Sequence, residues 1–259
     1  MHRDIVRQWA TMLAIWASFT ANILANLIPL NGLSIGAISN QLFGDVLITP
    51  ENYAFSVWGI IFLGLISFAF FQARSSQRHN PQIQRIGFLL VASSLAQILW
   101  VIVFLMRWFS LSLVAMIAIL LPLMEAYRRL QVGKQRVSPP QQWFVRIPIS
   151  LYLSWLALAT ILNVAIALTA LDWSGGGISP VLWTGMAMVL AAGVAAIAAI
   201  AHGDIAYVAV FAWGLIAIAV RQWEIPELAF TALGLVVIDV VVLLISLGRR
   251  KFSQPSELN

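Results

Sequence analysis

Long apolar segments separated by short polar ones make up most of this chain. Eight of these segments are close to the length that a helix needs to cross a bilayer, since a helix rises 1.5 Å per residue. The pattern predicts an all-α integral membrane protein with eight transmembrane helices. They lie near residues 9–29, 54–73, 85–106, 109–127, 146–170, 180–201, 205–220 and 227–247.

The composition excludes a water-soluble domain of this size. Of the 259 residues, 61% are hydrophobic and only 10% are charged, whereas a soluble domain carries about 25% charged residues. The run from Trp9 to Ile28 has no clear small-residue cleavage site, so we expect a retained helix and not a signal peptide. The chain has no cysteine, which excludes disulfides and thiol chemistry.

The positive charges alternate across the predicted spans. With the N-terminus inside, only Arg107 and Arg221 of the 15 basic residues lie outside. Basic residues prefer cytoplasmic loops, so both termini are predicted to be cytoplasmic, with a bacterial cytoplasmic membrane as the expected location. The net charge of +5 sits in short clusters between spans, which argues against nucleic acid as a partner. The inside residues are Arg3, Arg7, Arg74, Arg78, Arg85, Arg128, Arg129, Lys134, Arg136, Arg146, Arg249, Arg250 and Lys251.

The fifth predicted helix carries a polar and aromatic stripe. Tyr152, Trp155, Ala159 and Asn163 are spaced three, four and four residues apart, so they share one helix face. An amide facing lipid would be unsatisfied, and the stripe is therefore expected to face the bundle. Asn163 could bind a neighbouring helix while the aromatic rings fill the core, or the stripe could line a ligand site.

Two more predicted helices offer matching groups. Gln97 and Trp100 lie one turn apart on the third helix, and Trp58 lies near the start of the second. The topology places Trp58, Gln97, Trp100 and Asn163 in the outer half of the membrane. The sequence therefore predicts an apolar, aromatic pocket with a few amide groups, which is typical of small-molecule sites.

These motifs resemble those of the TspO/MBR family, the tryptophan-rich sensory or translocator proteins. The fifth helix reads Tyr152-Leu153-Ser154-Trp155, then Ala159-Thr160 and Asn163, with every spacing of the family kept. Gln97 and Trp100 match the family's Asn-x-x-Trp. Pro50, Tyr53, Phe55 and Trp58 are similar to the start of its second helix, although Val57 stands where the family has proline and the aromatic spacing is one residue shorter.

The resemblance implies a five-helix bundle over residues 1–171, followed by three additional transmembrane helices and a short basic tail over residues 172–259. It also implies a receptor or carrier for a flat apolar ligand, a tetrapyrrole such as a porphyrin or a sterol-like molecule, acting as a sensor in stress or light regulation. No cofactor is required, and a homodimer is a further expectation. The implied ligand-binding residues are Tyr53, Phe55, Trp58, Gln97, Trp100, Tyr152, Trp155 and Asn163.

Asp239 supports a different function. It is the only acid deep within a predicted span, where a charge is costly unless it is paired or functional. A second hypothesis is therefore a secondary transporter in which Asp239 is the proton- or ion-coupling group, although a helix–helix hydrogen bond would also explain it. Two more hypotheses fit the aromatic residues: an enzyme that degrades porphyrin, and a membrane assembly factor in which these residues only pack.

The remaining polar features have simpler explanations. No nucleotide, metal or catalytic-triad motif is present, so no catalytic residue and no metal ligand is predicted. His202 and Asp204 lie in a short turn and are expected to be hydrated or paired with each other. The connection from Leu30 to Leu47 is semi-apolar and could be an interfacial helix or a lid over an outward-facing cavity.

Overall fold

The computed structural model describes residues 2–252 and consists of helices and their connections. Seven helical segments are long and apolar enough to cross a membrane, and α9 is a shorter apolar helix. The predicted all-α membrane fold is confirmed, and these eight helices lie where the apolar segments indicate. They are α1 (His2–Leu27), α3 (Val57–Ala73), α4 (Pro81–Leu105), α5 (Phe109–Leu130), α7 (Ile147–Ala170), α8 (Pro180–His202), α9 (Ile205–Arg221) and α10 (Pro226–Phe252).

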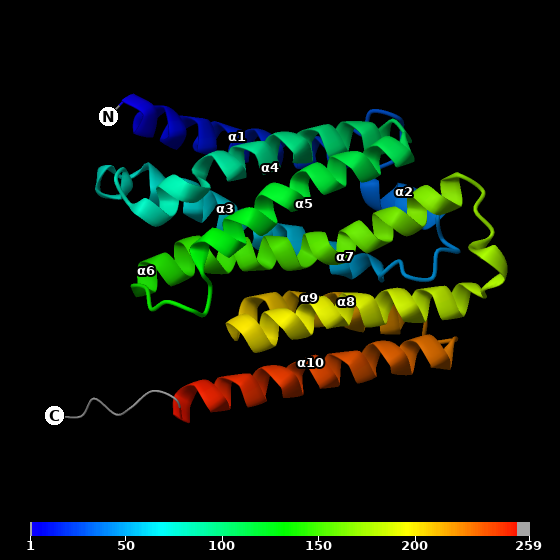
Figure 1. Ribbon diagram of the computed structural model, residues 1–259. Coiled ribbons are helices and arrows are strands. Elements are labelled where there is room, and N and C mark those ends of the chain that lie inside the picture. Colours follow the sequence, from blue (N-terminus) through cyan, green and yellow to red (C-terminus); the bar gives the residue numbers. More distant parts are fainter. Residues whose placement is uncertain (1, 253–259) are drawn as a thin grey trace.

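The helices run roughly along one axis, as Figure 1 shows. Helix α4 packs between α1 and α5, α5 packs on α7, and α9 joins α7 to the last helices. The start of α1 and the end of α10 lie at the same end of the bundle, on the left in Figure 1, as an even number of spans requires. Large apolar side chains on α8 and α10, such as Leu190, Ile197 and Phe230, are exposed and suit contact with lipid.

Short polar residues begin several helices. Ser34, Asn80, Ser179 and Asp204 each accept a hydrogen bond from a backbone N–H in the first turn of the following helix. These caps set the starts of α2 (Ile35–Gln41), α4, α8 and α9. The remaining short elements are η1 (Asn52–Ser56), η2 (Ser75–Gln77), α6 (Pro139–Gln141), η3 (Gln142–Arg146) and η4 (Gly175–Gly177).

One apolar core runs through both predicted parts of the chain. It includes Phe68 of α3, Phe104 of α4 and Ile119 of α5, together with Met188 of α8 and Phe211 of α9. The connection near residue 172 is thus a change of direction in the chain, and the side chains on its two sides pack together. Helix α9 packs on α7 as well as on α8 and α10, so it contacts both predicted parts of the chain.

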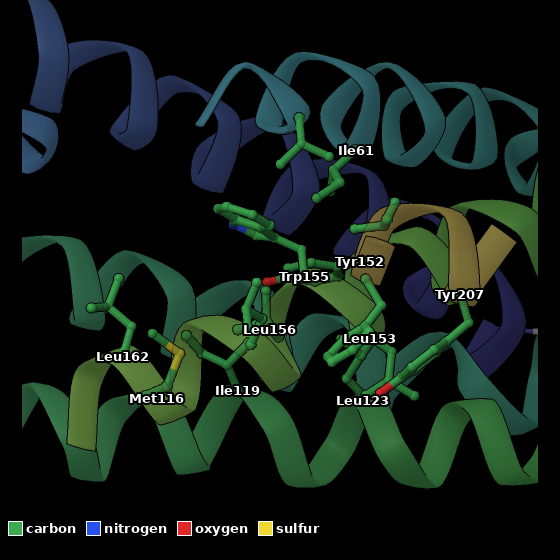
Figure 2. Close-up of a cluster of buried hydrophobic side chains, with 14 of the residues drawn as sticks. Ile61, Met116, Ile119, Leu123, Tyr152, Leu153, Trp155, Leu156, Leu162 and Tyr207 are labelled. Atoms are coloured by element: carbon green, nitrogen blue, oxygen red, sulfur yellow. The ribbon is translucent and has the colours of Figure 1, made fainter. Parts of the chain in front are cut away.

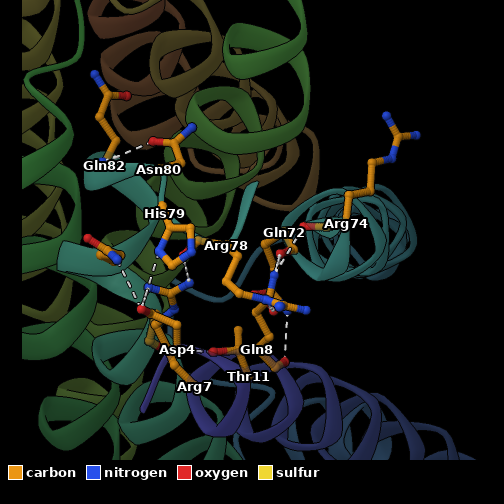
Figure 3. A network of polar contacts seen from close by, with 12 residues as sticks. Asp4, Arg7, Gln8, Thr11, Gln72, Arg74, Arg78, His79, Asn80 and Gln82 are labelled. Carbon is orange, nitrogen blue, oxygen red and sulfur yellow. Dashed lines mark hydrogen bonds and ion pairs between the residues drawn. The ribbon is translucent and has the colours of Figure 1, made fainter. Parts of the chain in front are cut away.

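A buried polar network holds the ends of α1, α3 and α4 together (Figure 3). Arg7 is buried and donates to Asp4 Oδ1 at 3.0 Å and to the Arg78 carbonyl at 2.9 Å. Gln8 and Gln72 exchange amide-to-carbonyl hydrogen bonds of 2.6 and 2.9 Å. The network therefore connects α1 with the α3–α4 turn.

The turn between α8 and α9 corrects one expectation. Asp204 and His202 are not paired with each other, because each binds a different part of the chain. The Asp204 carboxylate is buried and accepts from Tyr127 Oη at 2.9 Å and from Ser150 Oγ at 2.6 Å. His202 Nδ1 lies 2.8 Å from the Val132 carbonyl oxygen. The turn thus fixes the start of α9 against α5 and α7.

Candidate functional site

A small cavity lies between α3, α4, α5 and α7, at the end of the bundle that holds α2. Its volume is about 40 Å³, which is room for a few water molecules. Apolar and aromatic side chains make most of its wall, and Gln97, Asn163 and Ser39 are the polar members. The lining residues are Ile35, Ser39, Ile48, Pro50, Phe55, Trp58, Gln97, Trp100, Phe104, Met116, Trp155, Leu158, Ala159, Leu162, Asn163 and Ile166.

The connection between α1 and α3 forms one side of this cavity. We call residues 35–51 the lid; it comprises α2 and the loop that follows. Ile35 and Ser39 of α2, and Ile48 and Pro50 of the loop, are part of the cavity wall. The sequence allowed either a lid or a helix lying on the membrane, and the observed position is that of a lid.

Gln97 presents an unused hydrogen-bond donor at the cavity. Its side chain is 1% exposed, and its Oε1 accepts from Tyr152 Oη at 3.2 Å. The amide nitrogen Nε2 is buried and has no hydrogen-bond partner among the described residues. An unpaired buried donor costs about 1–3 kcal/mol, so an acceptor placed in the cavity would recover that energy.

The polar atoms of Trp100 and Asn163, in contrast, already have hydrogen-bond partners. Trp100 Nε1 donates to Asn163 Oδ1 at 2.7 Å, and Asn163 Nδ2 donates to Ser112 Oγ at 3.0 Å. These bonds join α4, α7 and α5 around the cavity. Ser112 also donates to the Phe109 carbonyl at 2.7 Å. The network fixes the plane of the Trp100 ring against Phe104, with which it stacks at 5.0 Å.

The remaining aromatic rings of the wall meet mostly edge to face. Phe55 and Trp155 have ring centroids 5.9 Å apart, and Trp58 meets Tyr152 at 6.0 Å while stacking on Phe62 at 5.4 Å. Figure 2 shows Trp155 leaving α7 toward Ile61 of α3, while Met116 and Leu162 lie on the side of α5. Indole faces in such a frame suit a flat apolar ligand.

Six of the eight residues predicted to bind a ligand line the cavity: Phe55, Trp58, Gln97, Trp100, Trp155 and Asn163. Tyr152 does not line the cavity, but it donates a hydrogen bond to Gln97, which does. Tyr53 faces elsewhere: its ring packs against Trp213 of α9 with centroids 5.1 Å apart. The 3₁₀ turn η1 before α3 separates Tyr53 from Trp58 in direction as well as in sequence.

The sequence allowed a lid but did not single out Ile35, Ser39 and Ile48 as wall residues. Phe104, Met116 and Ser112 were not predicted either. Ser112 carries a recognisable signal, because it is a buried hydroxyl within an apolar span that faces the amide of Asn163. Ile35 and Ser39 share one face of α2 at a spacing of four residues. The apolar residues Phe104 and Met116 carry no signal that would separate them from ordinary core.

The cavity wall carries no charged side chain among its lining residues. Known sites for drug-sized ligands measure about 300–1,000 Å³, far more than the 40 Å³ observed. The observed arrangement is therefore too small for a large ligand, and the wall favours apolar over ionic groups. Within the described part of the chain, no cluster of three or more His, Asp or Glu residues could hold a metal ion.

Asp239 lies apart from this cavity, on α10. Its side chain is 1% exposed, and neither carboxylate oxygen has a hydrogen-bond partner within residues 2–252. Its neighbours along the helix, Val237, Ile238 and Val241, are exposed on the other face. Asp239 therefore points into the contact of α10 with α8 and α9.

Comparison with known proteins agrees with this architecture. Residues 8–245 match the pattern that defines the family described as TSPO-like protein. The match continues through α8 and α9 and most of α10, beyond the five helices on which the resemblance was recognised. No curated protein and no solved structure matches the chain.

The family indicates a membrane protein of the receptor or transporter type, in contact with the lipid bilayer. The match covers more than nine-tenths of the chain, from the first helix to the last. Together with the eight apolar helices, it shows that the chain belongs to the TSPO-like protein family.

Proposed function

We propose that the protein is a membrane receptor or carrier for a flat, largely apolar molecule that binds in the cavity beneath the lid. A porphyrin-type tetrapyrrole is the first candidate, and a sterol-like molecule is the second. The family and the aromatic wall support this proposal. A role as a sensor in stress or light regulation, and a homodimer, would be consistent with it.

The observation that carries the proposal is the unpaired amide nitrogen of Gln97. A wall that only packed would bury hydrocarbon at this point, because an unpaired buried donor is unfavourable. Gln97 instead keeps its Nε2 without a partner among the described residues, at the edge of a cavity. A ligand carbonyl, hydroxyl or ring nitrogen would accept this hydrogen bond while its apolar body contacts Trp58, Trp100 and Trp155.

The size of the cavity adds a requirement. A tetrapyrrole needs several hundred cubic ångströms, so the lid must move when it binds. The carboxylates of protoporphyrin IX would have to remain at the mouth, because no lining side chain is charged. A sterol-like ligand, with one hydroxyl and no charge, meets this condition more simply.

Gln97→Leu tests the proposal in purified protein titrated with protoporphyrin IX, with tryptophan fluorescence as the readout. Loss of the donor should weaken binding about tenfold, the effect of one well-placed hydrogen bond. Gln84→Leu is the matched control, because Gln84 is exposed on the same helix, about 20 Å away at 1.5 Å per residue. An equal affinity for both variants and the wild type would contradict the assignment of Gln97.

A ligand bound in the cavity should quench the fluorescence of the tryptophan residues that line it. Trp100→Phe combined with Trp155→Phe should remove most of the saturable quenching. Trp9→Phe combined with Trp108→Phe should not, because these two indoles are 60% and 56% exposed and do not line the cavity. Quenching that persists unchanged in the first pair would place the ligand elsewhere. No saturable quenching by protoporphyrin IX or a sterol in the wild type would reject the proposed function.

A secondary transporter is the second candidate function, and Asp239 favours it. A carboxyl group that is buried without a partner among the described residues can take up a proton or a cation when the helices around it rearrange. Uptake of the candidate ligand into proteoliposomes under a proton gradient should then fall at least about tenfold in Asp239→Asn. Uptake that is unaffected by this substitution would remove the main support for coupled transport.

A further inference from the structure

The lid is fastened to α9, a helix outside the five on which the family resemblance was recognised. Arg221, at the end of α9, donates from its guanidinium to Asn40 Oδ1 at 2.6 Å. Gln222, the next residue, donates from Nε2 to the Leu47 carbonyl at 2.8 Å. Both parts of the lid, α2 and the loop, are thus held from one place.

Two more hydrogen bonds fix the point at which the lid joins α3. The Glu51 backbone N–H donates to the Ala217 carbonyl at 3.0 Å, and Trp213 Nε1 donates to the Ala54 carbonyl at 3.1 Å. Tyr53 packs against the Trp213 ring. Tyr53, which does not line the cavity, therefore helps to hold the C-terminal end of the lid against α9.

Helix α9 is itself held firmly. Its N-terminus is capped by the buried Asp204, which binds Tyr127 and Ser150. Gly214 lets α9 lie against Leu158, and Leu158 lines the cavity. A rigid α9 is a fixed support, so the lid can open only by breaking its bonds to α9 or by moving together with it.

We propose that α9 is the latch of the ligand cavity, and that release of Asn40 and Leu47 by Arg221 and Gln222 admits the ligand. This inference rests on the proposed function, because the latch matters only if the cavity takes a ligand. Arg221 is its strongest element, since a hydrogen bond from a charged donor is about twice as strong as a neutral one. The last three helices then regulate access to a site built by the first five.

The absence of cysteine from the chain allows a direct test. Ser39→Cys places one thiol on the inner side of the lid, at a residue that is 2% exposed and lines the cavity. Its labelling rate with a membrane-impermeant maleimide, in protein reconstituted in nanodiscs, measures lid opening without any ligand. Ser110→Cys, at an exposed position, gives the rate for an unprotected thiol.

Arg221→Ala in the Ser39→Cys background should raise the labelling rate about tenfold, as loss of a charged hydrogen bond predicts. Glu224→Ala is the matched control, because Glu224 is exposed in the same connection between α9 and α10. Its labelling rate should equal that of the parent. An unchanged rate in Arg221→Ala, or a parent thiol labelled as fast as the one at position 110, would overturn the latch.

A conservative variant guards against general loosening of the fold. Arg221→Lys should keep most of the protection of the thiol at position 39, because it keeps a charged donor for Asn40 Oδ1. Asn40 itself is left unchanged, because its Nδ2 also donates to the Gly36 carbonyl and to Asn52 Oδ1. Labelling in Arg221→Lys that is as fast as in Arg221→Ala would overturn the proposal.

The two proposals can fail separately. If protoporphyrin IX and sterols do not bind while Arg221→Ala still exposes the thiol, the latch stands and the proposed ligand class fails. If ligands bind but their association and dissociation rates are the same in Arg221→Ala and the parent, the latch fails and the site stands. Both rates should increase in Arg221→Ala, by about tenfold for association.

Discussion

Trp100 donates its indole N–H to Asn163 Oδ1 across 2.7 Å, and this bond joins α4 to α7 in the wall of the cavity, as does the bond from Tyr152 to Gln97. Both residues are buried, and Ser112 of α5 completes the group by accepting from the Asn163 amide. The wall is therefore held by side-chain hydrogen bonds between three helices, in a place where apolar packing alone would leave the ring planes less defined.

Trp100→Phe should destabilise the protein by ~1 kcal/mol, the usual value for one hydrogen bond between membrane helices. The phenyl ring can still stack on Phe104, so the loss comes from the indole N–H together with the smaller buried ring. Thermal unfolding in detergent should show a lower midpoint than in the wild type. Trp108→Phe is the control, because Trp108 is 56% exposed, and its midpoint should stay unchanged. Equal midpoints for both variants would contradict a stabilising bond between Trp100 and Asn163.

The helices could be predicted because bilayer length and backbone hydrogen bonding leave few possible structures. The predicted spans 54–73, 146–170 and 205–220 agree closely with the observed α3 (Val57–Ala73), α7 (Ile147–Ala170) and α9 (Ile205–Arg221). Helices α1 and α10 extend beyond their apolar segments, to His2 and Phe252, because polar residues continue a helix readily outside the hydrocarbon. Hydropathy marks the part in the membrane and not the end of the helix.

The stripe on α7 and the Gln97–Trp100 pair could be placed because helical spacing puts their members on one face. The role of α9 could not be found in this way. Arg221 and Gln222 bind the lid across more than 170 residues of sequence, and they carry no periodic signal. Tyr53 is the opposite case, in which a motif predicts a ligand contact that the structure does not show. Tyr53 lies in η1, and its ring packs against Trp213.

Gly214→Ala should separate α9 from α7. A Cβ atom at this position would overlap with Leu158 Cδ2, so the side chain of Leu158 or the helix must shift. We expect a loss of ~1–3 kcal/mol, as for overpacked cores in general, seen as a lower thermal midpoint. Leu158 lines the cavity, so ligand affinity should change as well.

Gly193→Ala is the matched substitution for Gly214→Ala. It lies on α8, and nothing lies within 4 Å of the added Cβ. Alanine is the better helix former by up to ~1 kcal/mol, so this variant should be as stable as the wild type or slightly more so. The same loss of stability at both positions would mean that the contact with Leu158 does not govern the result.

Arg7→Met should destabilise the end of the bundle where α1 begins. The guanidinium is buried and donates to Asp4 and to the Arg78 carbonyl (Figure 3), so its removal takes a charged donor from two half-buried acceptors. The expected loss is ~2 kcal/mol, which is typical for hydrogen bonds to charged groups. Arg3→Met removes the same positive charge from an exposed position four residues earlier and should change stability by less than ~0.5 kcal/mol.

Arg7→Met and Arg3→Met each lower the positive charge of the N-terminal segment by one. Comparing them therefore separates loss of the hydrogen bonds of Arg7 from any effect of charge on membrane orientation. Urea unfolding monitored by tryptophan fluorescence would measure the stability of both. A glycosylation or protease-accessibility reporter would show whether the orientation has changed. If both variants lost stability equally, the charge itself and not the network around Arg7 would be responsible.

Asp204 should tolerate an amide but not a truncation. In Asp204→Ala, the hydroxyls of Tyr127 and Ser150 lose their acceptor and α9 loses its N-cap, for a combined cost of ~3 kcal/mol. Asp204→Asn keeps an acceptor oxygen for the cap, and the two hydroxyls can turn to bind what remains, so ~1 kcal/mol is expected. Because α9 holds the lid through Arg221, Asp204→Ala should also speed labelling of a thiol at position 39. Normal protection of that thiol in a clearly destabilised Asp204→Ala protein would show that the lid does not depend on how the start of α9 is held.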